Sequence, residues 1–426
     1  MQDADPAEKP GKLQRAIEFF GLKRSMVGLL TMVILVGVGE KMSERFLPIY
    51  LLALSGLAFL PGLLNSMTNI LGALYSYPGG YLSDRLGTKR ALLVFNVIAM
   101  VGFAIVIIVP HWVAVFVGAV FFMSWTAVSL PASMDLVARV LPKNKRTMGV
   151  SMHSLVRRIP MALGPLIGGL LIDHYTRKYS ALYGETIGHD MGVSTGVRVA
   201  FAGALGLALL AAVMQALLIE DDRHQPRAKA EMNPLKSFRE MSPALRNLLT
   251  SDILIRFAEQ LPYAYMAIWA METAKGAGVS GFDFGVLTTI EMTVAILCYI
   301  PVAYLADKTH KKPFVLITFV FFTLFPLALW LSHTFWMLVI AFVIRGLKEM
   351  GEPTRKALIM DLAPEGKKAS TFGVYYLARD LVVGIVAASA GVLWLISPAA
   401  LFLTAFAMGV LGTAWFAIKG TDLPKA

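Results

Sequence analysis

Two stretches of the sequence set acidic and basic side chains next to each other within long apolar segments. The first stretch holds Glu40, Lys41, Glu44 and Arg45, and the second holds Arg345, Lys348, Glu349 and Glu352. On an α-helix, the spacing of the second set projects its members from one face. The first set places two carboxylates one turn apart with cations beside them. Such groups could bind a charged solute or take up and release protons, and Glu40 and Glu44 are the candidate proton carriers.

Other ionisable residues also lie inside apolar segments. They are Arg157, Arg158, Glu259, Glu291, Arg379 and Asp380, and Tyr263 follows Glu259 by one helical turn. A charged side chain at the centre of a bilayer costs about 2.5–3.5 kcal/mol or more, so several of them together usually line a cavity. Two interpretations stay open at this point: a polar pathway, or salt bridges that lock parts of the molecule together.

The elements that must position these charges are predicted to be membrane-spanning helices. The chain is 57% hydrophobic and only 16% charged, whereas soluble domains are about 25% charged. A span needs about 20 mostly apolar residues. Such runs predict twelve helices, at 26–53, 61–82, 91–109, 112–138, 147–172, 199–219, 248–271, 283–305, 313–332, 335–361, 369–396 and 398–418. The fully apolar segments Ala91–Val109 and Val315–Leu331 argue against a soluble helical bundle.

The distribution of basic residues predicts the orientation of these helices. The net charge of +11 could suggest nucleic acid, but most lysines and arginines fall in the tails and in the even-numbered connections. The positive-inside rule therefore places both termini in the cytoplasm of a multi-pass protein of the cell's inner membrane. No nucleic-acid partner is predicted.

Metal and enzyme chemistry have little support in the residue pattern. Cys298 is the single cysteine, and the histidines are scattered, so no metal site can be drawn from spacing. No phosphate-binding loop, nucleophile elbow or His-Glu-x-x-His motif occurs. We expect no catalytic residue, no metal, no cofactor and no enzymatic activity.

The chain divides into two related halves. A cytoplasmic N-terminal segment (1–25) precedes a six-helix half (26–219), a hydrophilic cytoplasmic loop (220–247), a second six-helix half (248–418) and a cytoplasmic tail (419–426). Tyr81-Leu82-Ser83-Asp84 reappears as Tyr304-Leu305-Ala306-Asp307, and Arg157 reappears as Arg379 at a nearly equal offset. Paired halves predict a solute site between them, near the bilayer midplane.

One loop carries a specific resemblance. The segment Gly80-Tyr81-Leu82-Ser83-Asp84-Arg85-Leu86-Gly87-Thr88-Lys89-Arg90 resembles the loop signature of the major facilitator superfamily, with Thr88 in place of a basic residue. The resemblance implies an all-α membrane protein with twelve transmembrane helices in two pseudo-symmetric six-helix halves. It implies that helices 1, 4, 7 and 10 line the cavity. It also implies a gating role for Gly80, Asp84, Arg85, Lys89 and Asp307.

Two further motifs refine this expectation. Gly164-Pro165-Leu166-Ile167-Gly168-Gly169 resembles the core of the superfamily's antiporter signature, although Pro160 replaces an expected glycine. Glu44-Arg45-Phe46 is similar to part of a motif of proton-coupled oligopeptide transporters, although Lys41 replaces its first glutamate. We take the second likeness as a hint of proton coupling.

These observations together predict a secondary active transporter of a small charged or amphiphilic organic solute. We expect a monomer in the lipid bilayer, driven by protons and working by alternating access, with efflux favoured. The residues expected to contact the solute are Lys41, Arg45, Arg157, Glu259, Tyr263, Glu291, Arg379 and Asp380. Breakable ion pairs would involve Arg158, Arg345, Lys348, Glu349 and Glu352. The alternatives are a proton-coupled importer of a zwitterionic or anionic nutrient and a membrane sensor that does not transport.

Overall fold

The computed structural model describes residues 24–86, 88–122, 156–220, 238–272, 276–308, 310–363 and 368–422. Every regular element in these residues is helical. Seven of the described segments are long and apolar enough to cross a membrane, and Trp112–Phe122 is a shorter apolar helix. Each of the twelve predicted spans overlaps at least one described helix, so the structure is consistent with twelve transmembrane helices.

The helices form two groups in chain order. The first half comprises α2 (Arg24–Glu44), α3 (Leu47–Ser55), α4 (Leu60–Leu86), α5 (Thr88–Ile108), α6 (Trp112–Phe122), α9 (Arg158–Tyr183) and α10 (Glu185–Leu218). The second half comprises α12 (Pro243–Tyr263), α13 (Met266–Met271), α14 (Gly281–Lys308), α15 (Lys311–Trp330), α16 (Phe335–Leu347), α17 (Glu352–Leu362), α18 (Lys368–Ala387), α19 (Ser389–Ile396) and α20 (Pro398–Lys419).

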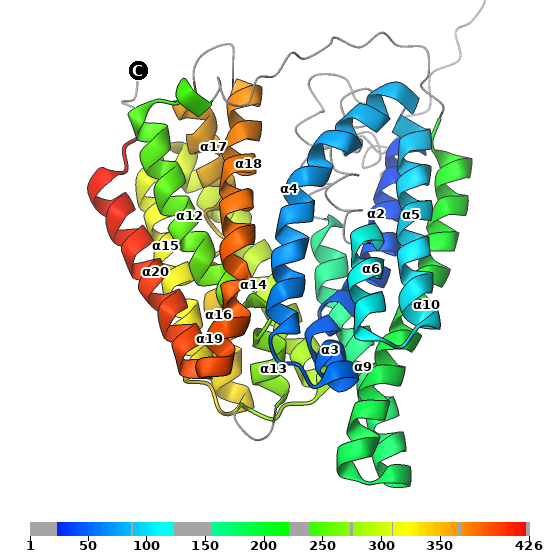
Figure 1. The fold of residues 1–426 in the computed structure, drawn as a ribbon. Coiled ribbons are helices and arrows are strands. Elements are labelled where there is room, and N and C mark those ends of the chain that lie inside the picture. Colours follow the sequence, from blue (N-terminus) through cyan, green and yellow to red (C-terminus); the bar gives the residue numbers. More distant parts are fainter. Residues whose placement is uncertain are drawn as a thin grey trace, which may run out of the picture.

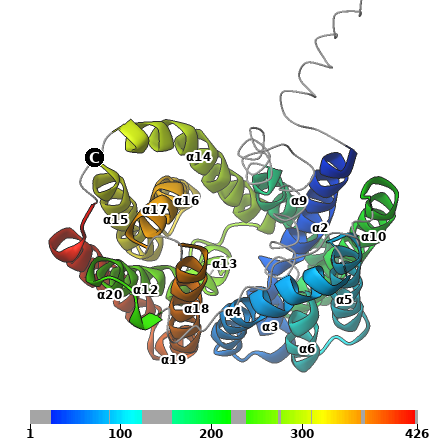
Figure 2. The ribbon, with the colours of Figure 1, turned by 90° about the horizontal axis from the view of Figure 1, so that it is seen from above.

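The two halves stand side by side and meet along two seams (Figures 1 and 2). One seam joins α9 to α14, and the other joins α4 to α18. At the second seam the hydroxyl of Ser66 donates to the carbonyl oxygen of Gly384 at 2.6 Å. The described chain ends at Glu220 and Asp422 lie at one end of the molecule, which we call the terminal end. The opposite end is the far end.

The internal repeat is visible in a pair of matching hydrogen bonds at the terminal end. Lys89, the second residue of α5, donates through Nζ to the carbonyl oxygen of Ala216 near the end of α10, at 2.7 Å. Lys312, the second residue of α15, donates to Ala417 near the end of α20, at 3.1 Å. A cation at a helix C-terminus satisfies its free carbonyl groups and complements its dipole. Equivalent helices are therefore tied together in the same way in both halves.

Burial follows what a lipid-facing protein requires. Large apolar side chains are exposed around the outside of the bundle; Ile418 is 77% and Leu297 68% exposed. Charged side chains lie inside instead, and Glu291, Lys348 and Arg355 are each at most 2% exposed. Lipid tails can cover the outer apolar surface, and the buried charges must find partners within the protein.

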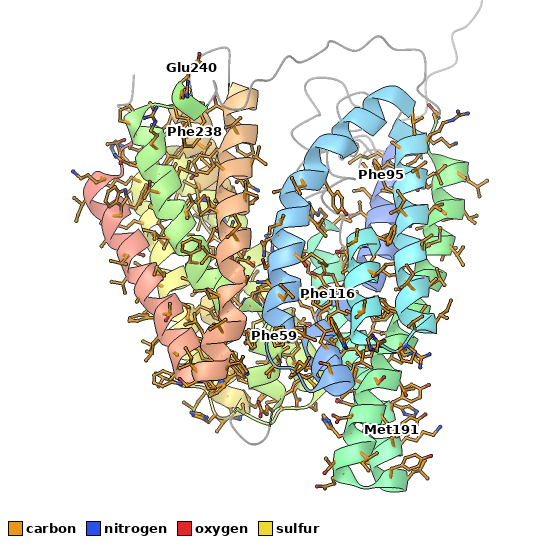
Figure 3. The ribbon with its side chains drawn as sticks, in the orientation of Figure 1. Phe59, Phe95, Phe116, Met191, Phe238 and Glu240 are labelled. Atoms are coloured by element: carbon orange, nitrogen blue, oxygen red, sulfur yellow. The ribbon has the colours of Figure 1, made fainter. Side chains whose placement is uncertain are left out.

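Two predicted helix boundaries differ from the structure. The predicted spans stopped at 172 and resumed at 199, but α9 and α10 continue to Tyr183 and from Glu185. They form a helical hairpin that projects beyond the far ends of the other helices, with Met191 past the level of Phe59 (Figures 1 and 3). The cause is close backbone packing: a Cβ at Gly192 would lie 2.3 Å from the Cα of Thr176. Gly188 and Gly196 approach α9 in the same way.

Candidate functional site

The first long helix of each half is broken at about the same depth. Between α2 and α3 the chain turns at Arg45 and Phe46, where Phe46 N donates to Ser43 O at 3.1 Å. Between α12 and α13 it turns after Pro262, whose carbonyl accepts from Tyr265 N at 3.0 Å. Proline lacks a backbone N–H and disrupts a helix. Broken helices leave backbone groups for other partners, and in transporters they often mark the solute site.

A cavity of about 190 Å³ lies between the two breaks. Its wall combines polar and apolar side chains. The polar lining residues are Glu44, Arg45, Asn65, Thr68, Asn69, Gln260 and Tyr263, and the apolar ones are Leu47, Pro48, Pro61, Leu64, Ala264, Met266 and Ala267. We call it the first cavity. An amphiphilic molecule fits such a mixed lining better than a fully polar one does.

A second cavity of about 200 Å³ adjoins the first. Its walls come from α4, α12 and α18, and they include Thr68, Asn69, Gly72, Ala73, Arg256, Gln260, Arg379, Asp380 and Val383. Three residues, Thr68, Asn69 and Gln260, belong to the walls of both cavities. Both cavities therefore lie at the contact between the halves and share these three side chains.

The charges of α2 form a compact group beside the first cavity. Lys41 pairs with Glu44, and its Nζ lies 3.1 Å from Glu40 Oε1. The guanidinium of Arg45 lies 5.3 Å from the centre of the Tyr263 ring in the other half. Its Nε and Nη1 are buried and have no hydrogen-bond partner among the described residues. Buried donors of this kind are costly unless a solute, water or another conformation satisfies them.

Residues predicted to form breakable ion pairs lie on α16 and around its end, and the structure shows their partners. Lys348 is 1% exposed and pairs with Glu259 and, at 3.2 Å, with Glu349. Arg158 of the first half reaches Glu349 of the second at 3.1 Å. This bond is an ion pair across the contact between the halves, as the gating hypothesis requires.

Arg345 and Glu291 form a second pair, more deeply buried, within the second half. Their side chains are 3% and 2% exposed, and Arg345 Nη1 lies 2.6 Å from Glu291 Oε2. Aromatic rings surround the guanidinium, with Tyr263 at 5.7 Å and Phe325 at 5.4 Å between guanidinium carbon and ring centre. Loss of one member of such a buried pair is strongly destabilising, because it leaves the other charge buried without its partner.

Sequence reasoning missed the most buried carboxylate. Asp252 on α12 is fully buried and pairs with Arg355. It also accepts from the hydroxyl of Tyr375 at 3.1 Å and from Arg379 Nη1 at 3.4 Å. The sequence held a signal for it, because Asp252, Arg256, Glu259 and Tyr263 recur at spacings of three and four residues along one helical face.

Arg256 belongs to the same face and was also missed. It pairs with Glu259, and its Nη2 lies 3.7 Å from Glu352 Oε2. Arg355 pairs with Glu352 as well. The predicted charges of α12 and α17 are therefore joined in one network behind the wall of the second cavity.

The structure sorts the predicted solute-contacting residues into two sets. Those that line a cavity are Arg45, Tyr263, Arg379 and Asp380, and the predicted proton carrier Glu44 also lines the first cavity. Lys41, Glu259 and Glu291 stand behind the walls in ion pairs, and Arg157 is the residue preceding α9 and lines neither cavity. Arg157 and Arg379 are thus not placed on opposite walls of either cavity.

The structure describes only part of the loop signature. Lys89 bonds within its own half, as described above. Gly80, Asp84 and Arg85 fall in α4 and Asp307 in α14, but their side chains lie outside the described part of the structure.

The seam between α9 and α14 includes hydrogen bonds at the start of α14. The carboxylate of Asp173 accepts from the backbone amides of Gly281 at 2.8 Å and Phe282 at 2.9 Å, the first two residues of α14. One turn earlier, a Cβ at Gly169 would lie 2.1 Å from the Gly281 carbonyl oxygen. The glycine permits the close approach, and the carboxylate satisfies free amides at a positive helix end.

Comparison with known families agrees with this architecture. The Major Facilitator Superfamily profile matches residues 29–273 and 248–425. The chain belongs to the major facilitator superfamily. Its two halves, the helix breaks and the cavities between them are therefore those of a membrane transporter family.

Individual relatives are more distant. The chain is 25% identical over 329 residues to the multidrug resistance protein MdtG of Escherichia fergusonii, covering 74% of each. It is 24% identical over 150 residues to an uncharacterized transporter of Bacillus subtilis, YqjV, covering 35% of this chain and 36% of that one.

Solved structures share the fold at low identity. A bacterial homolog of the human lysosomal transporter Spinster, inward-facing and unoccupied, gives a TM-score of 0.66 at 15% identity, covering 94% of this chain and 98% of that one. A peptide transporter POT in complex with sulfate gives 0.69 at 15% identity, covering 93% and 94%.

Proposed function

We propose that this facilitator exports a small amphiphilic organic solute that carries charge, in exchange for protons. The first cavity is the observation that carries the proposal, because its wall combines charged and polar side chains with apolar ones. It lies between the halves, where alternating access requires the solute to bind. The relatives named as multidrug resistance proteins favour efflux over import.

The charge of the solute enters the proposal through Arg45. Two of its buried N–H groups lack an acceptor among the described residues, and the residue borders the first cavity. A solute with acceptor atoms, bound beside Arg45, would accept hydrogen bonds from these N–H groups and offset the free-energy cost of burying them. Tyr263 offers a ring face to the apolar part of the same solute.

Proton coupling is assigned to Glu40 and Glu44. Both contact the single ammonium of Lys41, so any movement of Lys41 changes the proton affinity of both carboxylates. Coupling requires that a proton bind more tightly in one conformation than in the other. The monomer would sit in the inner membrane with its terminal end, and so both termini, in the cytoplasm, as the distribution of basic residues predicts.

The first experiment identifies a solute. Purified protein is screened for thermal stabilisation by a library of metabolites and drug-like compounds, since a ligand that binds only the folded state raises the melting temperature. The stabilising compounds are then tested for accumulation in vesicles that contain the protein and carry a pH gradient. A protein that binds none of them and moves none of them does not perform the proposed function.

The second experiment tests the coupling residues. Glu40→Gln and Glu44→Gln are each measured for accumulation driven by the pH gradient and for solute exchange without a gradient. A coupling residue loses the first activity and keeps the second. Glu185→Gln, at the exposed start of α10, is the matched control and should keep both. If both variants still accumulate the solute as the wild type does, the site lies elsewhere, with Glu259, Glu291 and Asp380 next in order.

A further inference from the structure

Gln260 occupies an unusual position in the transport pathway. It lies on α12 three residues before the helix ends, and it borders both cavities. In a regular helix, Ala264 N would donate to the carbonyl oxygen of Gln260, four residues earlier. Near the break it donates to the carbonyl oxygen of Pro262 instead. Asn65 of the other half takes that carbonyl through Nδ2 at 2.9 Å. The helix break therefore creates a backbone acceptor that the opposite half satisfies.

The side chain of Gln260 is held by the same half. Its Oε1 accepts from Asn69 Nδ2 at 3.2 Å and from Asn65 Nδ2 at 3.4 Å. Asn69 Nδ2 is itself fixed by the backbone oxygen of Asn65 at 2.8 Å. Two donors on one side of the amide decide which end is oxygen and which is nitrogen. Nε2 is left as the free end and has no protein acceptor among the described residues.

An amide fixed in this way is a prepared hydrogen-bond donor. Ordering a side chain on binding costs about 0.5–1.5 kcal/mol, and a group that is already held avoids that cost. Arg45 borders the first cavity, and Arg379 and Asp380 border the second, so each cavity that Gln260 lines also contains charged groups. Gln260 is thus placed to contact the uncharged middle of a solute whose charged end lies in one cavity.

We propose that Gln260 determines specificity by donating from Nε2 to a hydrogen-bond acceptor on the uncharged part of the solute. The substrate class is an amphiphile with a charged end and, separate from it, a carbonyl, ether or hydroxyl oxygen. This inference rests on the proposed transport function. The residue's bonds to Asn65 and Asn69 also join the two halves, so loss of the donor must be separated from loss of this link.

The Gln260→Glu variant separates loss of the donor from loss of the link between the halves. Its carboxylate oxygens continue to accept from both asparagines, but the donor is gone. Gln260→Leu removes both the link and the donor. Gln215→Leu is the matched control, because Gln215 is a fully buried amide that bonds Lys89 O within the first half, away from both cavities.

The probes are three pairs of labelled para-substituted aromatic ions: benzoates, benzenesulfonates and phenyltrimethylammonium salts. In each pair one member carries an acetamido group and the other an isobutyl group, so only one presents a carbonyl acceptor. Transport into vesicles by each variant is measured for both members. Taking the ratio within a pair cancels the effect of the added charge in Gln260→Glu, because both members share the same charged end.

The wild type and Gln215→Leu should prefer the acetamido member by about three- to tenfold, which is the factor supplied by one neutral hydrogen bond. In Gln260→Glu and Gln260→Leu the ratio should fall to about one. A preference that survives in Gln260→Glu shows that the amide is only a link between the halves and overturns the inference alone. If the wild type transports none of the six ions, the result contradicts the proposed function and, with it, this inference.

Discussion

The carboxylate of Asp173 should hold the far end of the two halves together. It accepts two backbone hydrogen bonds, at 2.8 and 2.9 Å, from the first turn of α14 across the seam. A hydrogen bond to a charged group contributes about 1.5–3 kcal/mol. When the halves separate, water replaces both partners, so we expect the net contribution of the pair to be about 2 kcal/mol. Asp173→Ala should therefore shift the equilibrium toward far-end opening by roughly thirtyfold.

The shift can be measured as a distance between spin labels on the two halves. Cys298 is the single cysteine, so a Cys298→Ala background allows labels at Lys178→Cys on α9 and Trp336→Cys on α16, both exposed positions. Electron–electron resonance on protein in lipid nanodiscs then gives the populations of short and long distances. The long-distance population should increase in Asp173→Ala.

The control is Asp190→Ala, because Asp190 is an exposed aspartate on the same hairpin whose described ion-pair partner is its neighbour His189. It should leave the distance distribution unchanged. Asp173→Asn retains one acceptor oxygen and should give an intermediate population. Identical distributions in Asp173→Ala and the parent would refute the reasoning, since the two hydrogen bonds would then contribute nothing to closure.

Three other substitutions have definite expected outcomes. Asp252→Ala removes the most buried of the carboxylates that pair with Arg355 and should lower the free energy of unfolding by about 3–5 kcal/mol, measured by thermal unfolding in detergent; adding Arg355→Met should restore part of it. Lys89→Met removes one hydrogen bond to the end of α10 and should cost about 1 kcal/mol while transport continues; a stable variant that no longer transports would instead support a gating role. Gly169→Ala places a methyl group against the first carbonyl of α14, so the labelled far end should open as it does in Asp173→Ala.

The architecture and the location of the charges could be predicted because both follow from the cost of placing charge in lipid. Apolar runs had to be helices, and charges within them had to be buried with partners. The ion pairs of Lys41 with Glu44 and of Arg345 with Glu291 show this directly. The family assignment followed from the loop signature and is confirmed.

Other features depend on contacts that a single sequence does not reveal. The hairpin at the end of α9 is held by glycines against a neighbouring backbone, whereas its polar composition resembled that of a loop. Gln260 and Asn69 carry no charge, so the search for ionisable residues passed over them, although both line the two cavities. The break in α12 did have a signal in Pro262, but a proline within a transmembrane helix does not specify which carbonyl will find a new partner.

The α9–α10 hairpin is also a suitable site for binding an antibody fragment to this molecule. Most of the described chain lies within the helical bundle. Such a bundle has few projecting epitopes for an antibody fragment and few features by which electron-microscopy images can be aligned. The hairpin projects past the other helices (Figure 3), and the backbone packing at Gly188 and Gly192 makes it a rigid extension of the first half. A binder raised against its tip would report the tilt of that half without touching either cavity, so single particles could be sorted by conformation during transport.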